Sequence, residues 1–525
     1  MSPRILALAA ALTLAASGCG VLPFQQAAPP SPAQPSDPPS SAPATSAPAS
    51  ADPTATPTAT SQDTREALAE TRGTDNANLK VEVVGLNRVK GKHLVVQIRL
   101  SNTGTEKDLP WSSDMGDPTR PLGKMDWASG IGVLDAQAHT WILPYKPADS
   151  PCLCSDQDRD DLPYFIEPGQ SITVYGVMPA PSGNPAATTV VTPVGPPMPN
   201  IPISDDPPTG DFPDPDAEPV TPITRSILLP SESLDKSEET ADDGKDLQVN
   251  LSSDVLFAVN KATLTPRAKA VLARTAKLID ASPATAVKVE GHADSSGNDA
   301  INDPLSLRRA QAVQRALSAV LTRDGVGFQA KGYGSRRPLY GNDTDEGKRR
   351  NRRVTVTFAK PKPAASPDPA NDVVQTLAPG DDELKATVTA KGQPFAMEIT
   401  GLRRLPGGVG VLTYTITNEG SAEAWFNELH HGQDWQSYKY QSASNVRLTD
   451  VAARRQYLAG RLQVVTDNGV DSYCACTGVS GVRLSTEKFA PGQTREFWGL
   501  FALPDDAQSL KVKIATFRDL QVPVR

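Results

Sequence analysis

The sequence predicts a multidomain chain in which a central α+β domain is flanked by two repeated, all-β sandwiches. Three observations lead to this fold class. The chain has 525 residues, more than one hydrophobic core usually organises. Apolar residues recur at helical spacing only in the middle of the chain, whereas the regions on either side alternate with the period of strands. Four sequence markers also occur in the same order in both outer regions, which indicates an internal duplication.

Residues 1–19 resemble a bacterial lipoprotein signal with its lipobox. Arg4 precedes an apolar run, Ile5–Ala16, that is too short to span a bilayer, and small residues then lead to Cys19. We expect cleavage before Cys19 and acylation of this residue, which would anchor the chain to an envelope membrane outside the cytoplasm. That membrane would be the outer membrane of a two-membrane cell, or the outer face of the cell membrane otherwise. An ordinary secretory signal with a chance cysteine is the alternative.

Three segments have the composition of linkers. Residues 20–75 are rich in Pro, Ala, Ser and Thr, and residues 361–382 are again rich in Pro and Ala. Residues 205–245 are acidic and are also predicted to be a linker. The formal net charge of the whole chain is −8, which argues against a nucleic-acid partner.

The two outer regions, 76–204 and 383–525, carry the duplication. The interval from Leu86 to Asn102 equals that from Leu402 to Asn418, and each asparagine begins an Asn-x-Gly turn signal. Short alternating runs, β-branched residues and Pro-Gly turns predict an antiparallel β-sandwich of immunoglobulin-like type in each copy. The remaining shared markers are Cys152-Leu153-Cys154 and Cys474-Ala475-Cys476, then Pro-Gly-Gln at 168–170 and 491–493, then strand-like runs with Gly176 and Gly499.

The cysteines other than Cys19 form one Cys-x-Cys pair in each repeat: Cys152, Cys154, Cys474 and Cys476. An even number of cysteines outside the reducing cytosol is typical of disulfides, so a disulfide within each repeat is the favoured interpretation. A redox-active pair is one alternative. Zinc binding by the second pair with His430 and His431 is another, although the first repeat has no matching histidines. We expect no metal and no cofactor.

The central region, 246–360, has the predicted order β-α-β-α-β-β, with helices on one face of a sheet. Its apolar residues change from strand to helix spacing and back, and Thr265-Pro266 is typical of a helix start. The predicted elements are strand Val255–Ala258, a helix capped by Thr265, strand Val287–Glu290, a helix over about 304–321, and strands near Phe328–Tyr333 and Arg353–Phe358.

Four blocks of residues make this central region recognisable. They are Gly291-His292-Ala293-Asp294, the run from Asn302 to Ala310, Gly332-Tyr333-Gly334 with Pro338, and Asn351-Arg352-Arg353. In this order they resemble the OmpA C-terminal-like domain, which peptidoglycan-associated lipoproteins share. The resemblance covers only the central region and makes no statement about the two repeats.

The resemblance implies a site for the diaminopimelate of uncrosslinked or lightly crosslinked peptidoglycan stem peptides. Asp294 would receive the ligand ammonium, Arg309 its carboxylate, and Asn302 would add a hydrogen bond. The residue types fit this chemistry, because a guanidinium offers two parallel donors to a carboxylate. Arg309, early in its helix, would also lean back over the loop after Asp294. A structural ion pair between Asp294 and Arg309, without any ligand, is the alternative.

The neighbouring residues are interpreted more simply. Arg352 and Arg353 are expected to be structural, with Asn351 fixing the turn. Ala258 stands where family members often carry an aspartate, so one secondary contact to the ligand would be missing. A basic run in a predicted loop is interpreted as a solvated face: Arg336, Arg337, Lys348, Arg349 and Arg350.

The sequence therefore predicts a non-catalytic envelope lipoprotein that binds peptidoglycan and links a membrane to the cell wall. No serine-hydrolase, zinc-protease or cysteine-nucleophile motif occurs in it. Two alternatives stay open. One is an envelope assembly or signalling protein whose β-sandwiches bind a protein partner. The other is a cell-wall hydrolase whose catalytic residues lie in a sandwich.

Overall fold

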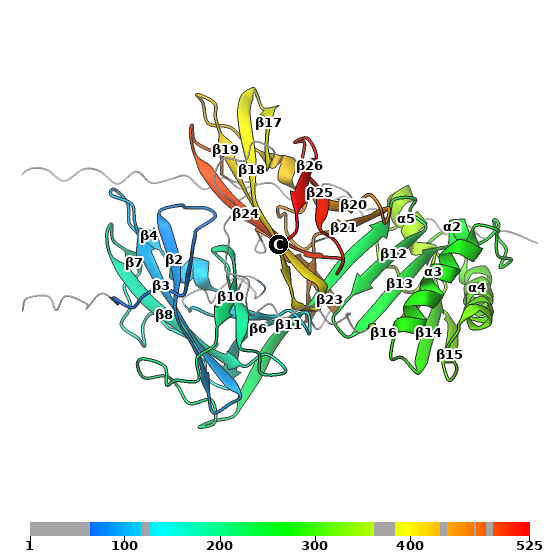
Figure 1. The fold of residues 1–525 in the computed structure, drawn as a ribbon, viewed down its shortest axis with the longest axis horizontal. Coiled ribbons are helices and arrows are strands. Elements are labelled where there is room, and N and C mark those ends of the chain that lie inside the picture. The colour runs from blue at the N-terminus through cyan, green and yellow to red at the C-terminus, as the bar shows by residue number, and fades with distance from the viewer. Residues whose placement is uncertain are drawn as a thin grey trace, which may run out of the picture. The chain divides into compact units, whose positions relative to one another are not determined.

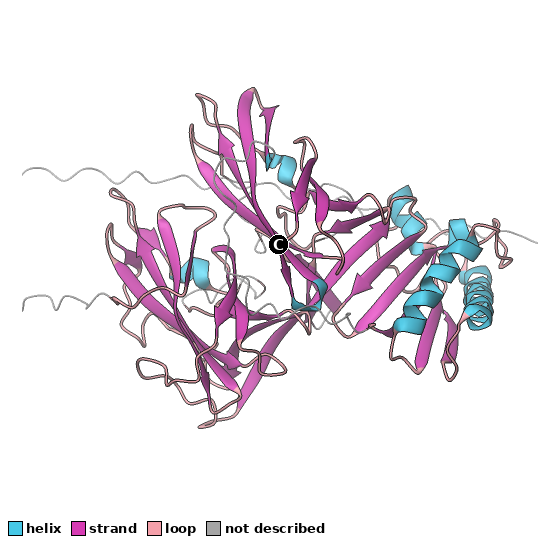
Figure 2. Cartoon of the chain, viewed as in Figure 1, coloured by secondary structure: helices cyan, strands magenta, loops and turns pink. Residues whose placement is uncertain are grey.

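The computed structural model describes residues 63–117, 119, 127–361, 384–430, 438–466, 469–478 and 487–525 (Figure 1). These described residues belong to one compact unit. Figure 2 shows that the described part consists mostly of strands, with few helices. No helix within these ranges is both long and apolar enough to cross a membrane. Cys19 and residues 362–382 of the predicted linker 361–382 lie outside the described residues. The predicted linker 20–75 was too long, because Ala69–Arg72 form a strand of the first repeat.

Each repeat contains a four-stranded antiparallel sheet, and the two sheets have the same strand order. The order is β1-β2-β3-β8 in the first repeat and β17-β18-β19-β24 in the second. A register shift interrupts the ladder at Gly85 in the first repeat and at Gly401 in the second, which are matching positions. The strands are β1 (Ala69–Arg72), β2 (Leu79–Val89), β3 (His93–Asn102), β8 (Ser171–Pro179), β17 (Lys385–Ala390), β18 (Gln393–Leu405), β19 (Val409–Asn418) and β24 (Thr494–Ala502). The shared order supports the duplication, and the immunoglobulin-like type stays a prediction.

The asparagine of each Asn-x-Gly signal holds its turn in the same way. Asn102 is buried and its Nδ2 donates to two backbone carbonyls, at 2.8 Å each. Asn418 is buried as well, and its Nδ2 donates to two carbonyls at 2.9 and 3.0 Å. In both repeats the side-chain oxygen accepts from the glycine two residues later. The signal therefore works as a buried hydrogen-bonding centre in each copy.

The second sheet of each repeat ends on one shared strand, β11 (Val220–Ser233). In the first repeat the order is β10-β9-β5-β6, and β6 pairs with β11. In the second repeat the order is β26-β25-β20-β21, and β21 pairs with the C-terminal part of β11. These strands are β5 (Gly132–Asp135), β6 (Thr140–Pro147), β9 (Ala187–Thr192), β10 (Gly195–Pro202), β20 (Val446–Asp450), β21 (Arg455–Leu458), β25 (Ser509–Ile514) and β26 (Leu520–Pro523). One strand thus serves both copies.

The smaller elements of the repeats complete this arrangement. The hairpin β22–β23 also pairs with β11, through β22. A two-stranded sheet, β4–β7, and a short helix, α1, belong to the first repeat, and two short 3₁₀ helices, η3 and η4, belong to the second. Their bounds are β4 (Leu109–Pro110), α1 (Ser112–Met115), β7 (Phe165–Ile166), η3 (Pro406–Gly408), η4 (Asn427–Leu429), β22 (Arg461–Thr466) and β23 (Gly469–Cys474).

The acidic segment 205–245 is not the linker that its composition predicted. β11 and β12 (Glu238–Asp242) lie in it, and both belong to the large sheet. Its carboxylates have basic partners: Asp216, for example, lies 2.7 Å from Lys92 Nζ. Glu232 is 2% exposed, and Ile227 on the same strand is fully buried. The prediction was wrong because composition counted these charges as solvated, whereas they are paired within the fold.

Groups from the three regions meet at His139, which is fully buried and has a positive φ of 47°. Its Nε2 lies 2.8 Å from the carbonyl oxygen of Gly407 in the second repeat. Lys360, at the end of the central domain, donates to the same carbonyl at 2.7 Å and pairs with Asp242 at 2.7 Å. The central domain is therefore in direct contact with both repeats.

The central domain has the predicted four strands and two long helices, with different limits, and it also has two short helices, α2 and α5, that were not predicted. Its sheet order is β13-β16-β14-β15, in which β14 and β15 are parallel. The predicted strand Val255–Ala258 is wrong, because residues 253–256 form a short helix and the first strand lies earlier. The second helix begins at Asp299, where the side chain of Asn298 caps it. The elements are β13 (Asp246–Ser252), α2 (Ser253–Leu256), α3 (Ala268–Ala281), β14 (Ala286–Gly291), α4 (Asp299–Val320), β15 (Gly327–Gly332), α5 (Asp345–Asn351) and β16 (Arg353–Ala359).

Two glycines let helix α4 approach the sheet closely. A Cβ atom on Gly291 would lie 2.0 Å from the carbonyl oxygen of Ser306, and one on Gly332 would lie 2.5 Å from the backbone nitrogen of Leu307. Neither contact is possible, so only glycine allows this separation. The close approach brings the N-terminal half of α4 against the ends of β14 and β15.

Candidate functional site

A cavity of about 450 Å³ lies where β14 ends, between the start of α4 and the short helix α2. Its wall includes Asp294 from the end of β14, Asn302 and Arg309 from α4, and Arg352 from the residue after α5. The structure therefore brings the three residues selected from the sequence to one place. The volume lies within the range of about 300–1,000 Å³ that is usual for small-molecule sites.

Asp294 is the fixed carboxylate of this cavity. It follows β14 by three residues and is 6% exposed. Its Oδ1 accepts a hydrogen bond from the backbone nitrogen of Ser296 at 2.9 Å, and its Oδ2 accepts one from Arg352 Nη1 at 2.6 Å. These two bonds set the orientation of the carboxylate before any ligand arrives.

Arg309 is the buried cation of the cavity. Its Nε donates to the carbonyl of Lys261 at 3.1 Å, and its guanidinium carbon lies 5.2 Å from the ring centre of Phe257. Burial lowers the pKa of Arg309. It forms no ion pair with any residue in the described ranges, and Asp294 pairs with Arg352 instead. The alternative of a structural Asp294–Arg309 ion pair is therefore wrong.

Asn302 connects the two charged groups indirectly. It lies on the first turn of α4, and its Nδ2 donates to the carbonyl of Ser296 at 2.9 Å. Ser296 is also the residue whose backbone nitrogen bonds Asp294. Asn302 thus holds the loop that orients the carboxylate, and it lines the cavity itself.

Arg352 was expected to be structural, yet it lies in the cavity wall between two carboxylates. Its Nε and Nη2 donate to Asp254 at 2.9 and 2.7 Å, and its Nη1 donates to Asp294. The hydrogen bonds to Asp254, and then to Asp294, raise the pKa of Arg352. Asp254 was not among the residues selected from the sequence, because a strand was predicted next to it. Serines followed by an aspartate, at 252–254, are typical of a helix start and could have indicated it.

The other residues selected from the motif, Asn351, Arg353 and His292, are buried within the central domain. Asn351 is fully buried, and its Oδ1 accepts from the backbone nitrogens of Leu339 and Tyr340 at 2.9 and 3.1 Å. Burial lowers the pKa of Arg353 to about 10 and that of His292 to about 3. His292 borders the cavity as a neutral ring stacked on Tyr333. Ala258 also lines the cavity, at the position where an aspartate had been noted as missing.

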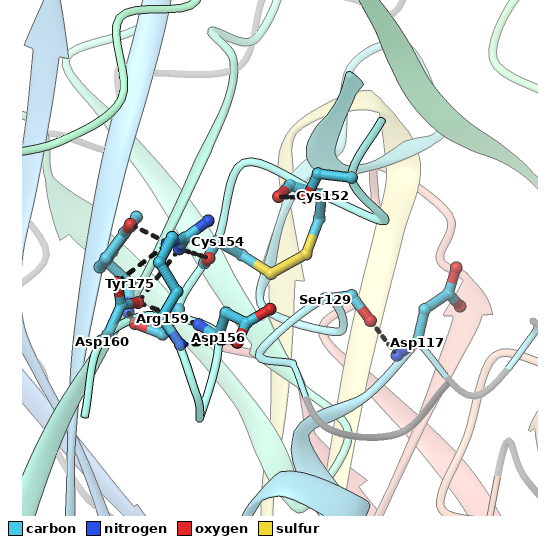
Figure 3. The surroundings of a disulfide bond; sticks show 10 residues. Asp117, Ser129, Cys152, Cys154, Asp156, Arg159, Asp160 and Tyr175 are labelled. Atoms are coloured by element: carbon cyan, nitrogen blue, oxygen red, sulfur yellow. Dashed lines mark hydrogen bonds and ion pairs between the residues drawn. A yellow bond between two sulfur atoms is a disulfide. The ribbon is translucent and has the colours of Figure 1, made fainter. Parts of the chain in front are cut away.

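The cysteines of the two repeats are joined as Cys152–Cys154 and Cys474–Cys476. Figure 3 shows the first pair, with Arg159 beside it. Arg159 Nη2 donates to the carbonyl of Cys154 at 2.5 Å and to the hydroxyl of Tyr175 at 2.9 Å. All four cysteines are buried and lie far along the chain from the cavity residues.

A cysteine in a disulfide has no thiolate to offer a metal, so this pairing argues against the zinc interpretation of Cys474 and Cys476. In the described part of the chain, no group of His, Cys, Asp and Glu side chains is arranged to hold a metal ion. His431, the other proposed ligand, lies outside that part.

Comparison with known proteins places the cavity in a family. A family model described as the OmpA family matches residues 256–352. YfiB of Escherichia coli is 32% identical over 118 residues, which are 22% of this chain and 72% of that protein. The outer-membrane lipoprotein YfiB of Pseudomonas aeruginosa is 33% identical over 112 residues (21% and 64%). The peptidoglycan-binding protein ArfA of Mycobacterium bovis is 35% identical over 102 residues (19% and 31%).

The match is partial in most relatives. The chain spans 33%, 52% and 30% of the length of the first three curated relatives that it matches. Two cavity residues, Ser253 and Asp254, precede the matched range, as do β11, β12 and β13.

Proposed function

Because this chain belongs to the OmpA family through residues 256–352, we propose that it is a non-catalytic envelope lipoprotein that holds peptidoglycan. The ligand group in this proposal is the diaminopimelate of stem peptides. The observation that carries the proposal is the guanidinium of Arg309, which is buried at the cavity and has no carboxylate partner among the described residues. One relative is named a peptidoglycan-binding protein and another an outer-membrane lipoprotein.

The charges of the cavity fit a zwitterionic ligand. Asp254 and Asp294 contribute two negative charges, and Arg309 and Arg352 contribute two positive ones. Arg352 already bridges both aspartates, whereas Arg309 has no carboxylate partner among the described residues. A ligand carboxylate would therefore bind Arg309. The ligand ammonium would donate hydrogen bonds to the lone pairs of the Asp294 carboxylate that are still available. This amino-acid end is the part of diaminopimelate that remains free in an uncrosslinked stem peptide.

Asn302 has a double role in this proposal. Its Nδ2 holds the Ser296 carbonyl, and its side-chain oxygen accepts a hydrogen bond from the ligand ammonium. The missing aspartate at Ala258 is offset by Asp254, which brings a carboxylate to the same cavity from helix α2.

Anchoring completes the proposed function. Acylation of Cys19 would fix the N-terminus to an envelope membrane, and the Pro- and Ser-rich residues that follow would give the reach to the wall. The chain would then connect the membrane to peptidoglycan without catalysis.

The test is co-sedimentation of residues 20–525 with purified peptidoglycan that contains diaminopimelate. We expect the wild type to pellet and the Arg309→Ala and Asp294→Ala variants to stay in solution. Loss of one partner of a charged contact should weaken binding by about 2–5 kcal/mol. Arg308→Ala is the matched control, because Arg308 is exposed on the same helix and does not line the cavity.

A second wall preparation tests the ligand group itself. Peptidoglycan that carries lysine in place of diaminopimelate lacks the carboxylate that Arg309 would bind, so the wild type should not pellet with it. Binding of both preparations, or equal pelleting of Arg309→Ala and wild type, would contradict the proposed site. Soluble wall fragments in the supernatant would instead support the hydrolase alternative.

A further inference from the structure

Helix α5 connects the cavity to a part of the chain outside the family match. Arg350, near the end of this helix, has a side chain that is 3% exposed. Its Nη2 donates to Glu232 of β11 at 2.6 Å, and its Nη1 donates to Glu239 of β12 at 2.8 Å. Both glutamates precede residue 256, where the family match begins. The helix is therefore held by carboxylates that the family region does not supply.

The second repeat reaches the same carboxylate. Gln456 of β21 donates from its Nε2 to Glu232 Oε2 at 2.8 Å, so the two oxygens of Glu232 connect the repeat to Arg350. Tyr340, before α5, donates its hydroxyl hydrogen to Glu239 and packs against Leu458 of the second repeat.

The two glutamates stabilise the charged form of Arg350 in this contact. Burial alone would lower the pKa of Arg350, but Glu239 and Glu232 outweigh burial, and its pKa is raised. The basic run 348–350 was interpreted as solvated, and for Arg350 that interpretation was wrong. Buried ion pairs of this kind have strict geometry, so a displaced partner is costly.

Only one residue separates Arg350 from the cavity residue Arg352. That residue, Asn351, is held by hydrogen bonds to Leu339 and Tyr340. The backbone nitrogen of Arg352 donates to Lys348 at 3.0 Å. The position of Arg352, and so of the carboxylates it bridges, therefore depends on where α5 lies.

We propose that the second β-repeat is a positioning module for the wall-binding cavity, and that Gln456, Glu232 and Arg350 transmit its docking to Arg352. The inference rests on the proposed function for the identity of the ligand. The second repeat, which lies outside the family match, would then have a role in wall binding. Because coupling of two binding events is reciprocal, a bound stem peptide also strengthens the contact between α5 and the repeat.

The test is calorimetric titration of residues 20–525 with a soluble disaccharide–tripeptide that contains diaminopimelate. Gln456→Ala removes one hydrogen bond to Glu232 and leaves the buried charges in place. It should weaken binding about five-fold or more, the usual lower bound of such coupling. Glu232→Gln should weaken it further. Gln521→Ala is the matched control, because Gln521 lies in the same repeat and its Nε2 donates at 2.7 Å to Ser509 of that repeat, away from Glu232.

Thermal unfolding and hydrogen exchange of residues 345–351, measured on the same samples, separate positioning from stability. A merely structural role of Gln456 would lower the unfolding temperature and leave the dissociation constant unchanged. Positioning predicts that the folded Gln456→Ala variant has a larger dissociation constant than the wild type. It also predicts that hydrogen exchange of residues 345–351 in the wild type slows when the fragment binds. If Glu232→Gln does not fold, Gln456→Ala decides.

Arg309→Ala, titrated alongside, distinguishes the two proposals. If Arg309→Ala abolishes binding and Gln456→Ala binds like the wild type, the positioning role is refuted and the wall site stands. If the wild type does not bind the fragment, the proposed function fails and the positioning role fails with it.

Discussion

Replacement of Gly291 by alanine tests whether the close approach of α4 builds the cavity. The new Cβ would lie 2.0 Å from the carbonyl oxygen of Ser306, and its next contacts would also be backbone atoms of that residue. Backbone atoms cannot rotate away as a side chain can. Since real contacts of this kind are not shorter than 3.0 Å, the helix must retreat by about 1 Å.

The magnitude follows from this displacement. Forcing one extra carbon into a packed interface costs about 1–3 kcal/mol. Ser306 lies on α4 between Asn302 and Arg309, so both cavity residues move with the helix. Sites lose function when their groups lie outside about 0.5 Å of the productive geometry, so we expect weaker wall binding as well.

Hydrogen exchange of residues 299–320 measures the local effect in a chain of several regions, where one global unfolding free energy is not defined. Gly291→Ala should lower the free energy of opening of α4 by about 1–3 kcal/mol. Gly327→Ala is the matched control, because its Cβ would meet only the carbonyl of Thr285 at 3.6 Å. Alanine there should leave α4 unchanged. Unchanged exchange and unchanged wall binding in Gly291→Ala would refute the reasoning.

Two further predictions concern protonation and anchoring. Burial lowers the pKa of His292 to about 3, so its ring stays neutral between pH 5 and 8, and nuclear magnetic resonance should show no titration there. The contribution of the neutral ring to folding stability is complete above a pH of about 6.5, the pKa of histidine in the unfolded chain, and it is lost as the pH falls toward 3. A titration of His292 near pH 6.5 would contradict this prediction. For Cys19, labelled palmitate should enter the wild type and not Cys19→Ser. A labelled Cys19→Ser variant, or an unlabelled wild type, would speak against the lipoprotein signal.

The cavity residues were accessible to sequence reasoning because their geometry is local. Asp294 follows a strand and Arg309 lies in the helix after the next loop, so strand, loop and helix alone bring them together. Asn302 lies on the same helix. The structure places all three in one cavity wall.

The partners of Arg352 and Arg350 were not accessible in this way. Arg352 contacts Asp254, 98 positions earlier, and Arg350 contacts Glu232, 118 positions earlier. Such pairings depend on the tertiary fold, and neither composition nor periodicity records them. The prediction that the acidic segment 205–245 is a linker was wrong for the same reason, because a sequence does not show whether a carboxylate is paired or solvated.

The limits of the first strand show a different failure. Residues 255–258 are apolar and short, and such a run does not distinguish a strand from a helical turn. The strand β13 lies before it, in the sequence Asp246–Ser252, and its partners are β12 and β16. Long-range pairing decided the assignment there.

The shared strand β11 has a consequence for pieces of this chain. β11 pairs with the edge strand of each repeat, β6 and β21. The next strand, β12, pairs in the same way with β13 of the central domain. A fragment cut at the borders of any one region would expose a row of unpaired backbone groups, which is the usual route to edge-to-edge aggregation. The segment between the regions therefore acts as edge protection for all of them.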